Sequence, residues 1–457
     1  MSKNTDMLYY IPEWDDLVTK NYDFENDKDI DKEKLYAHEI YPQANYDGIL
    51  ASRMKLEESK SKIVQMREMG GVHQFFRFSG PVFGDCGAWG YVKEKDPPFK
   101  TNDLLDFYHE LRFDFGVSID HLCIPGFEEE FYYRKALTLK NAEKFYSRHQ
   151  QKGYSFIPVG VAQGWNEDTY RQSIHELLDI GYRYLALGGI ARAPSQEIIK
   201  ILQAIKPELE KVAKFEKVDL HLFGVARLEA IRPFRNLGVT SFDSASPLRT
   251  AWLSSKKNYR DMNWNGYAAI RLPFLARDRK FKELIANELY SVDELEEKEL
   301  MLKIMLHRLD DDGSRTPEEV VEGFINLYNE FVPKTPDRTA EYMRTLEQKP
   351  WKNCQCPICK ELGIEVIIFR GNNRNRRRGF HNTYVFYSLL KKMLIDENFT
   401  LEGELDEESE ESERKEADEQ PGKGPKKESK SILSFLKPET NFSSTNTKKG
   451  KDLLEFL

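Results

Sequence analysis

The chain has 457 residues, of which 40% are hydrophobic and 32% charged, and a formal net charge of −8 at pH 7. No run approaches the roughly 20 apolar residues that a membrane-spanning helix needs. Residues 1–31 are acidic and lack both the apolar stretch of a signal peptide and the basic character of a transit peptide. We therefore expect a cytoplasmic protein with no membrane partner, holding one large domain with an appendage, or two domains.

Short apolar runs separated by helix-length polar stretches extend from about residue 75 to residue 243. They predict six strands, at residues 80–83, 115–119, 156–162, 184–187, 220–223 and 239–242. The intervening segments, such as 168–180 and 195–213, have helical periodicity and good helix formers. Repeated alternation predicts a parallel sheet with crossover helices, and six such units favour a (β/α)8 barrel of the TIM type over an open sheet. The alternative of a Rossmann sheet is less favoured still, because no helix begins with a nucleotide-binding glycine fingerprint.

A polar residue or a glycine follows each of these predicted strands. In chain order they are Asp85, Asp120, Gln163, Gly188 with Gly189, Gly224 and Asp243. In a (β/α)8 barrel all of them would converge on the carboxyl-terminal rim, where such enzymes hold their chemistry. Polar strand ends are also ordinary helix caps, so the series indicates a site more strongly than any one member does.

Three cysteines lie within six residues, at Cys354, Cys356 and Cys359, and His381 follows. Three thiolates and an imidazole make a closed tetrahedral zinc site, with no position left for a catalytic water. Cys-x-Cys spacing is too tight for an ordinary disulfide, and disulfides are rare inside cells. The pattern predicts one structural Zn²⁺ per chain, and thiols without a metal are the alternative.

Arginines crowd the segment before the histidine of this cluster. We predict a basic loop whose guanidinium groups contact nucleic-acid phosphates, formed by Arg374, Arg376, Arg377 and Arg378. Arg249, six residues beyond Asp243, is a further candidate for contacting a nucleic-acid phosphate. A solvated basic loop without a ligand is the alternative.

The end of the chain has a different composition. Residues 402–419 hold eleven acidic residues against two basic ones, so the rest of the chain is nearly neutral and its charge does not argue against a polyanionic partner. Few aromatic residues occur beyond residue 400, which predicts a disordered tail. The expected organisation is an N-terminal extension (1–74), a barrel (75–350), a zinc-binding subdomain with a closing helix (351–400) and the tail (401–457).

Taken in order, the strand-end segments resemble the conserved blocks of the tRNA-guanine transglycosylase superfamily. The segments are Asp85-Cys86-Gly87-Ala88-Trp89, Ser118-Ile119-Asp120, Gly160-Val161-Ala162-Gln163-Gly164, Ala186-Leu187-Gly188-Gly189, His221-Leu222-Phe223-Gly224-Val225 and Ser241-Phe242-Asp243-Ser244, followed by the cysteine and histidine cluster. The resemblance covers about residues 80–381. Ser244-Ala245-Ser246-Pro247-Leu248-Arg249 and the arginine run look most like the DNA-modifying branch, which installs 7-deazaguanine bases. The tRNA enzymes have a Pro-Thr-Arg motif instead.

This resemblance implies roles for particular residues. Asp243 is the expected nucleophile at the anomeric carbon, and Asp85 the general acid and base. The expected base-binding residues are Asp120 as acceptor, Gln163 and the Gly189 backbone N–H as donors, Gly188 for close approach, and Trp89 and Phe223 as stacking walls.

The function implied is a transglycosylase (pentosyltransferase) that exchanges guanine in DNA for 7-cyano-7-deazaguanine (preQ0) through a covalent aspartyl-glycosyl intermediate. Its partners would be DNA and the free 7-deazaguanine base, with a homodimer and DNA-modification partner proteins left open. One alternative is a tRNA-guanine transglycosylase. The other is a non-catalytic nucleic-acid-binding subunit, against which the presence of both Asp85 and Asp243 counts.

Overall fold

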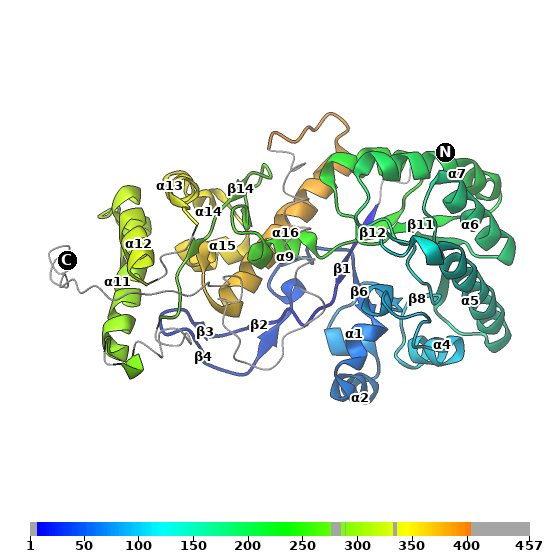
Figure 1. The fold of residues 1–457 in the computed structure, drawn as a ribbon, viewed down its shortest axis with the longest axis horizontal. Coiled ribbons are helices and arrows are strands. Elements are labelled where there is room, and N and C mark those ends of the chain that lie inside the picture. The colour runs from blue at the N-terminus through cyan, green and yellow to red at the C-terminus, as the bar shows by residue number, and fades with distance from the viewer. Residues whose placement is uncertain (1–6, 276–284, 288, 332–335, 404–457) are drawn as a thin grey trace. The chain divides into compact units, whose positions relative to one another are not determined.

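Eight parallel strands close into a barrel in which each strand pairs with the next along the chain and the first pairs with the last (Figure 1). They are β1 (Leu8–Pro12), β6 (Gly48–Ser52), β7 (Val82–Asp85), β8 (Phe115–Val117), β9 (Ile157–Ala162), β10 (Tyr184–Leu187), β11 (Asp219–Leu222) and β12 (Ser241–Asp243). The computed structural model describes residues 7–275, 285–287, 289–331 and 336–403. The predicted barrel and its six predicted strands are confirmed. Almost all of the predicted tail lies outside the described residues.

The barrel begins much earlier in the chain than the sequence analysis predicts. β1 and β6 both lie in residues 1–74, the segment that we expected to be an N-terminal extension. Tyr9 and Tyr10 of β1 are fully buried. These two strands were not predicted because each is only five residues long. The segment between them also lacks a helix of the length seen between strands after residue 75.

The barrel interior is filled by branched and aromatic side chains from alternate strand positions. The buried cluster consists of Tyr10, Leu50, Phe83, Val117, Val159, Val161, Tyr184 and Ala186, and Phe223 packs against it. Inward-facing side chains of this kind make the barrel a packed core and leave its chemistry to the strand ends.

Helices follow most strands and cover the outside of the barrel. Their bounds are α1 (Arg53–Glu57), α2 (Lys60–Met69), α3 (Val72–Phe76), α4 (Thr101–Glu110), α5 (Phe131–Lys152), α6 (Glu167–Ile180), α7 (Ser195–Ala213), α8 (Ile231–Asn236) and α9 (Ser246–Leu253). Figure 1 shows α5, α6 and α7 side by side along the outer wall. The two predicted helices correspond to α6 and α7. Asn166 caps α6 by accepting a hydrogen bond from the Thr169 N–H, and Gly181 ends it in the left-handed conformation.

Short 3₁₀ helices and small sheets occupy the connections. The 3₁₀ helices are η1 (Ala37–Glu39), η2 (Ala88–Tyr91), η3 (Glu128–Glu130), η4 (Leu228–Ala230) and η5 (Gly363–Ile367). The paired strands are β2 (Val18–Thr19) with β5 (Lys34–Leu35), β3 (Tyr22–Asp23) with β4 (Lys28–Asp29), β13 (Tyr259–Arg260) with β14 (Gly266–Tyr267), and β15 (Ile270–Arg271) with β16 (Ile368–Phe369). We call residues 17–35, which contain β2 to β5, the N-terminal ribbon.

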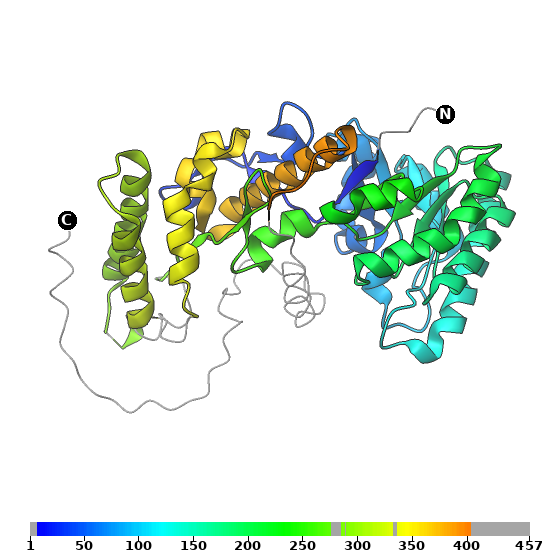
Figure 2. The same cartoon turned by 90° about the horizontal axis from the view of Figure 1, so that it is seen from above.

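From residue 292 onward the described chain is mostly helical. It contains α11 (Val292–Asp311), α12 (Pro317–Phe331), α13 (Thr339–Gln348), α14 (Pro350–Asn353), α15 (Pro357–Leu362) and α16 (Gly371–Ile395). α16 runs alongside α9, the helix that follows the last barrel strand (Figure 2). None of the helices in the described part of the chain is long and apolar enough to cross a membrane.

Candidate active site and metal centre

The residues predicted to act on the base gather at the carboxyl ends of the strands. Asp85 and Asp243 are the last residues of β7 and β12. Gln163, Gly188 and Phe223 directly follow β9, β10 and β11, and Asp120 lies three residues beyond β8. The structure therefore brings the predicted site residues to one rim of the barrel, while their roles remain predictions.

A buried network joins Asp120 to its neighbours on this rim. The Gln163 side-chain amide donates to Asp120 Oδ2 at 2.6 Å, and the Cys86 thiol donates to Asp120 Oδ1 at 3.1 Å. The other end of Gln163, Oε1, accepts from the Cys123 N–H at 3.2 Å. Burial raises the pKa of Asp120, and its hydrogen bonds oppose that rise. The network fixes both side chains in place, as a hydrogen-bonding surface for a flat ligand requires.

Glycine is required beside this network. A Cβ atom at Gly188 would lie 2.2 Å from Gln163 Nε2 and 3.2 Å from Asp120 Oδ2. Gly189 has φ +78°, a conformation that other residues rarely adopt. The backbone at these two positions thus approaches the polar network as closely as the resemblance implies.

The two aromatic side chains expected to stack on the base, Trp89 and Phe223, differ in their surroundings. Trp89 lies in η2 with 44% of its surface exposed, and the Arg192 guanidinium is 5.1 Å from its ring centre. Phe223 is partly buried, and its ring lies edge-on to that of Phe83. Trp89 therefore has an exposed ring surface at the rim for a stacking partner, whereas Phe223 is anchored in the barrel core.

The two carboxylates proposed for the chemistry lie in unlike environments. Burial, and then the neighbouring Asp120 carboxylate, raise the pKa of Asp85 to about 7. Asp243 is 6% exposed, and its Oδ1 atom accepts a hydrogen bond from the Gly224 N–H at 3.1 Å and lies 3.1 Å from His221 Nε2. The Gly224 N–H and the His221 ring thus hold the Asp243 carboxylate in place, whereas Asp85 is poised to exchange a proton near neutral pH.

The four predicted metal ligands are buried and converge on one point. Their ligand atoms lie within 4.8 Å of one another, and His381 Nδ1 is 3.7, 3.4 and 3.3 Å from the sulfur atoms of Cys354, Cys356 and Cys359. Tetrahedral Zn²⁺ bonds to sulfur and nitrogen place such atoms about 3.5 Å apart, so the donor set fits zinc. His381 Nε2 donates to the Arg260 carbonyl at 2.7 Å, which leaves Nδ1 as the ligand atom.

Comparison with known proteins agrees with this geometry. A family model described as queuine tRNA-ribosyltransferase matches residues 28–255. A DNA-guanine transglycosylase from Salmonella montevideo is 33% identical over 417 residues, which cover 85% of this chain and 97% of that relative. The chain belongs to the tRNA-guanine transglycosylase family. It is therefore an enzyme of the pentosyltransferase kind.

Relatives whose names refer to tRNA match a shorter part of this transglycosylase. The queuine tRNA-ribosyltransferases from Psychrobacter sp. (strain PRwf-1) and Acinetobacter baylyi are 27% and 26% identical over 206 and 209 residues. These matches cover 40% and 41% of this chain, and 52% and 53% of the relatives. The similarity to the Salmonella protein thus extends over about twice as much of the chain.

The predicted phosphate-binding loop is wrong for three of its four arginines. Arg374, Arg377 and Arg378 lie on α16, are at most 2% exposed and bond to the protein itself. Arg374 pairs with Asp27 and Glu365, and Arg377 donates to the Thr19 carbonyl at 2.8 Å. Arg378 donates to the Val366, Ile368 and Ala251 carbonyls. These guanidinium groups hold the transglycosylase together and cannot reach a phosphate.

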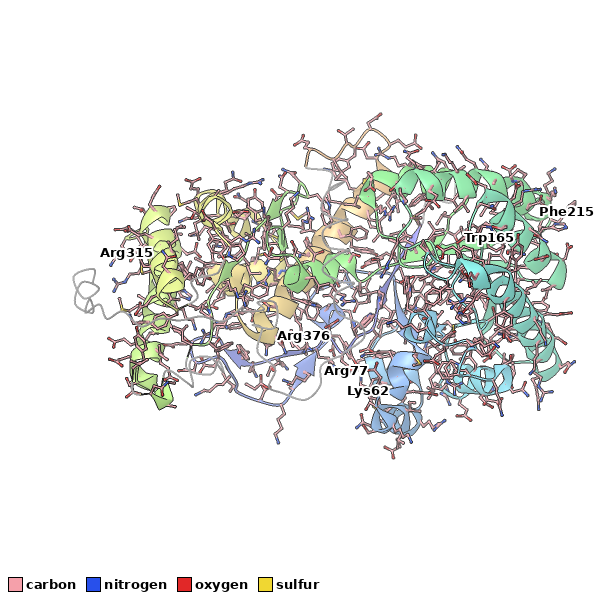
Figure 3. All side chains as sticks on the ribbon, viewed as in Figure 1. Lys62, Arg77, Trp165, Phe215, Arg315 and Arg376 are labelled. Carbon is pink, nitrogen blue, oxygen red and sulfur yellow. The ribbon has the colours of Figure 1, made fainter. Side chains whose placement is uncertain are left out.

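The other two arginines predicted to contact the nucleic-acid backbone, Arg376 and Arg249, are only partly accessible to solvent. Arg376 donates to the Leu17 carbonyl at 2.8 Å and lies 3.6 Å from an Asp16 oxygen, beside the N-terminal ribbon (Figure 3). Arg249 is half-buried, with its guanidinium carbon 4.9 Å from the Trp14 ring centre. It follows Asp243 on α9, so a phosphate contact there remains a prediction.

Two side chains that support Asp243 and Asp120 were not predicted from the sequence. His221 contacts Asp243, and Cys86 donates to Asp120. A histidine inside a run of apolar strand residues was the available signal for His221. Only the pairing of β11 with β12, which places His221 opposite Ser241, shows what the side chain reaches.

Proposed function

We propose that this enzyme exchanges guanine in DNA for a 7-deazaguanine base, 7-cyano-7-deazaguanine (preQ0), through a covalent aspartyl-glycosyl intermediate. The observation that carries the chemistry is a pair of carboxylates on one barrel rim: Asp85, with its pKa raised to about 7, and Asp243, held through one oxygen by Gly224 and His221. The choice of DNA rests on the similarity to the Salmonella DNA-guanine transglycosylase along nearly all of that protein's length.

In the first half-reaction, a lone pair of the Asp243 carboxylate forms a bond to C1′ of the target deoxyribose. The C1′–N9 bond breaks, its electron pair leaves with guanine, and Asp85 supplies the proton that neutralises the departing base. The pKa of Asp85, raised to about 7, suits this role because a large fraction of the carboxyl groups still carries a proton near neutral pH.

In the second half-reaction the same residues work in reverse. N9 of the incoming base forms a bond to C1′ and gives its proton to the ionised Asp85. The C1′–oxygen bond breaks and its electron pair returns to Asp243. A single carboxyl group with a pKa near the working pH serves both directions, as a reversible exchange requires.

Recognition of the base follows from the network around Asp120. A guanine-like ring offers donors at N1 and at the exocyclic amine, which match the Asp120 carboxylate, and a carbonyl oxygen, which matches the Gln163 amide and the Gly189 N–H. Trp89 and Phe223 would stack on its faces, and such contacts contribute about 1–3 kcal/mol per base. The target nucleotide must leave its stack to reach this rim.

Zn²⁺ is the metal that suits the buried Cys354, Cys356, Cys359 and His381 cluster best. It would be held by three sulfur atoms and one imidazole nitrogen as a structural ion, with no open position. Its contribution is folding free energy for the segment that connects α14 to α16. A cytoplasmic location fits DNA and a free base as substrates.

The test is base exchange with purified components. The enzyme is incubated with isotopically labelled preQ0 and single-stranded DNA, duplex DNA or tRNA, and nucleosides are then identified by mass spectrometry. We expect deazaguanine deoxynucleosides from DNA and little incorporation into tRNA, whose 2′-hydroxyl adjoins the carbon under attack. Incorporation into tRNA alone would support the alternative that the family model's description favours. No incorporation into either would leave a non-catalytic nucleic-acid-binding subunit.

A further inference from the structure

A continuous chain of buried polar side chains leads away from the proposed nucleophile. His221 Nε2 lies 3.1 Å from Asp243 Oδ1, and His221 Nδ1 lies 2.9 Å from Ser241 Oγ. Ser241 Oγ in turn lies 2.8 Å from the Tyr184 hydroxyl. His221 is fully buried, Ser241 is 1% exposed and Tyr184 is 6% exposed. Solvent therefore does not compete for these hydrogen bonds.

The directions of these hydrogen bonds follow from the acceptor at one end. An ionised Asp243 only accepts, so His221 Nε2 must carry the hydrogen that lies between them. In a neutral imidazole, Nδ1 is then an acceptor and takes the Ser241 hydroxyl hydrogen. Ser241 oxygen remains able to accept from Tyr184. All three hydrogen bonds can therefore form together, with each donor pointing along the series from Tyr184 toward Asp243.

Both hydrogen bonds described for the Asp243 carboxylate converge on the same oxygen. Oδ1 accepts from His221 and from the Gly224 N–H, and Gly224 has φ +73°, which suits glycine. Among the described residues none is found donating to Oδ2. The carboxylate is thus held by one oxygen while the other is left for attack on the sugar.

We propose that His221 is a positioning residue that donates from Nε2 to Asp243 Oδ1 and thereby speeds the breakdown of the glycosyl-enzyme. The inference rests on the proposed function. In the intermediate Oδ2 is bonded to C1′ and Oδ1 is the ester carbonyl. When the incoming base attacks and the C1′–Oδ2 bond breaks, negative charge returns to the carboxylate and spreads onto Oδ1. Two donors already aimed at that oxygen stabilise the charge as it develops.

The same histidine connects the nucleophile to the base-stacking wall. The His221 ring lies 4.7 Å from the Phe223 ring, edge-on, and 4.9 Å from the Phe83 ring, stacked. A purely structural role would rest on these ring contacts, which phenylalanine retains. The hydrogen-bonding role would rest on Nε2–H, which phenylalanine lacks and the side-chain amide of glutamine places at a similar distance.

This difference defines the variants. His221→Phe removes the donor, His221→Gln keeps a donor, and Tyr182→Phe is the matched control. Tyr182 is also fully buried, and its hydroxyl donates to the Ala142 carbonyl away from the rim. Rapid-quench experiments would measure formation of the covalent enzyme–DNA complex and its resolution by added preQ0.

Loss of one charge-assisted hydrogen bond predicts that His221→Phe resolves the complex about 10- to 100-fold more slowly, so that the complex accumulates. The KM for the incoming base should change little. His221→Gln should recover most of the rate, and Tyr182→Phe should match the wild type. Resolution by His221→Phe at the wild-type rate would overturn the proposal, and so would equal impairment of the Phe and Gln variants.

A second measurement needs no turnover. Long-range ¹H–¹⁵N correlation spectra of protein labelled in histidine, with His221 assigned from the His221→Gln spectrum, report which ring nitrogen is protonated. The expected form carries hydrogen on Nε2. Base exchange together with a His221 that carries its hydrogen on Nδ1 alone would refute the positioning role alone. An Nε2–H His221 in a protein that exchanges no base on any nucleic acid would refute the proposed function instead.

Discussion

Asp85 offers a test of the site that measures stability as well as activity. Moving a carboxyl pKa from 3.8 to about 7 corresponds to about 4 kcal/mol, at about 1.4 kcal/mol for each pKa unit. Because Asp85 keeps partial contact with solvent, we expect roughly 2–4 kcal/mol of this in practice. The folded protein therefore carries an energetic cost whenever Asp85 is ionised.

The sign of the pH dependence follows from this shift. The folded-state pKa of Asp85 lies above its unfolded value, so the fold is favoured when the carboxyl is protonated and loses stability as pH rises from about 4 through about 7. Asp85→Asn stays neutral and accepts the same backbone hydrogen bonds. It should raise the free energy of unfolding by roughly 2–4 kcal/mol at pH 8, and by less than half of that at pH 5.

The measurement is urea unfolding of the wild type and of Asp85→Asn at pH 5 and pH 8, with metal present. Asp179→Asn is the control, because the Asp179 side chain is 70% exposed and its neutralisation should leave stability almost unchanged. Base exchange should be lost in Asp85→Asn at both pH values, since an amide cannot pass a proton. A variant that is less stable than the wild type at pH 8, or a gain that does not depend on pH, would refute the assigned pKa.

Three further variants test the remaining assignments. Asp243→Asn should abolish base exchange and trapping of labelled DNA while leaving the circular dichroism spectrum unchanged; normal turnover would remove Asp243 from the mechanism. Cys356→Ser should release the metal and expose residues 353–381 to limited proteolysis. One zinc per chain in metal analysis of this variant would contradict the predicted site. Arg374→Met should lower the free energy of unfolding by about 3–5 kcal/mol, because it removes the cation shared by the buried carboxylates of Asp27 and Glu365 and leaves them Arg370 and His307 as partners. The salt dependence of DNA binding by that variant should stay as in the wild type.

The strand-end residues were predictable from the sequence because the information is local. An apolar run followed by Asp85, Gln163 or Asp243 indicates a strand and its carboxyl end, and a barrel brings such ends together whatever the loops do. The metal ligands were predictable for the same reason, since three of the four lie within six residues.

The errors involve partners that are distant in the sequence. Composition before His381 does not distinguish a basic loop from a buried helix, because one of the two carboxylates that neutralise Arg374 is Asp27, 347 residues away. β1 was missed since its pairing with β12 becomes visible only when the barrel closes. The link from His221 to Asp243 depends on the register between two strands, which no single segment encodes.

The contacts of α16 with the N-terminal ribbon bear on how the chain is made. Arg374 and Arg377 reach Asp27 and the Thr19 carbonyl, so the helix that carries His381 is anchored to the N-terminal ribbon, whose Asp27 is synthesised 347 residues before Arg374. At roughly 5–20 residues per second, that ribbon waits about 20–70 s for its partner to be synthesised. Until then Asp27 lacks both of its arginine partners, Arg370 and Arg374. The metal-binding segment is therefore not a separable module, and a chain ending near residue 350 would leave residues 17–35 without these contacts.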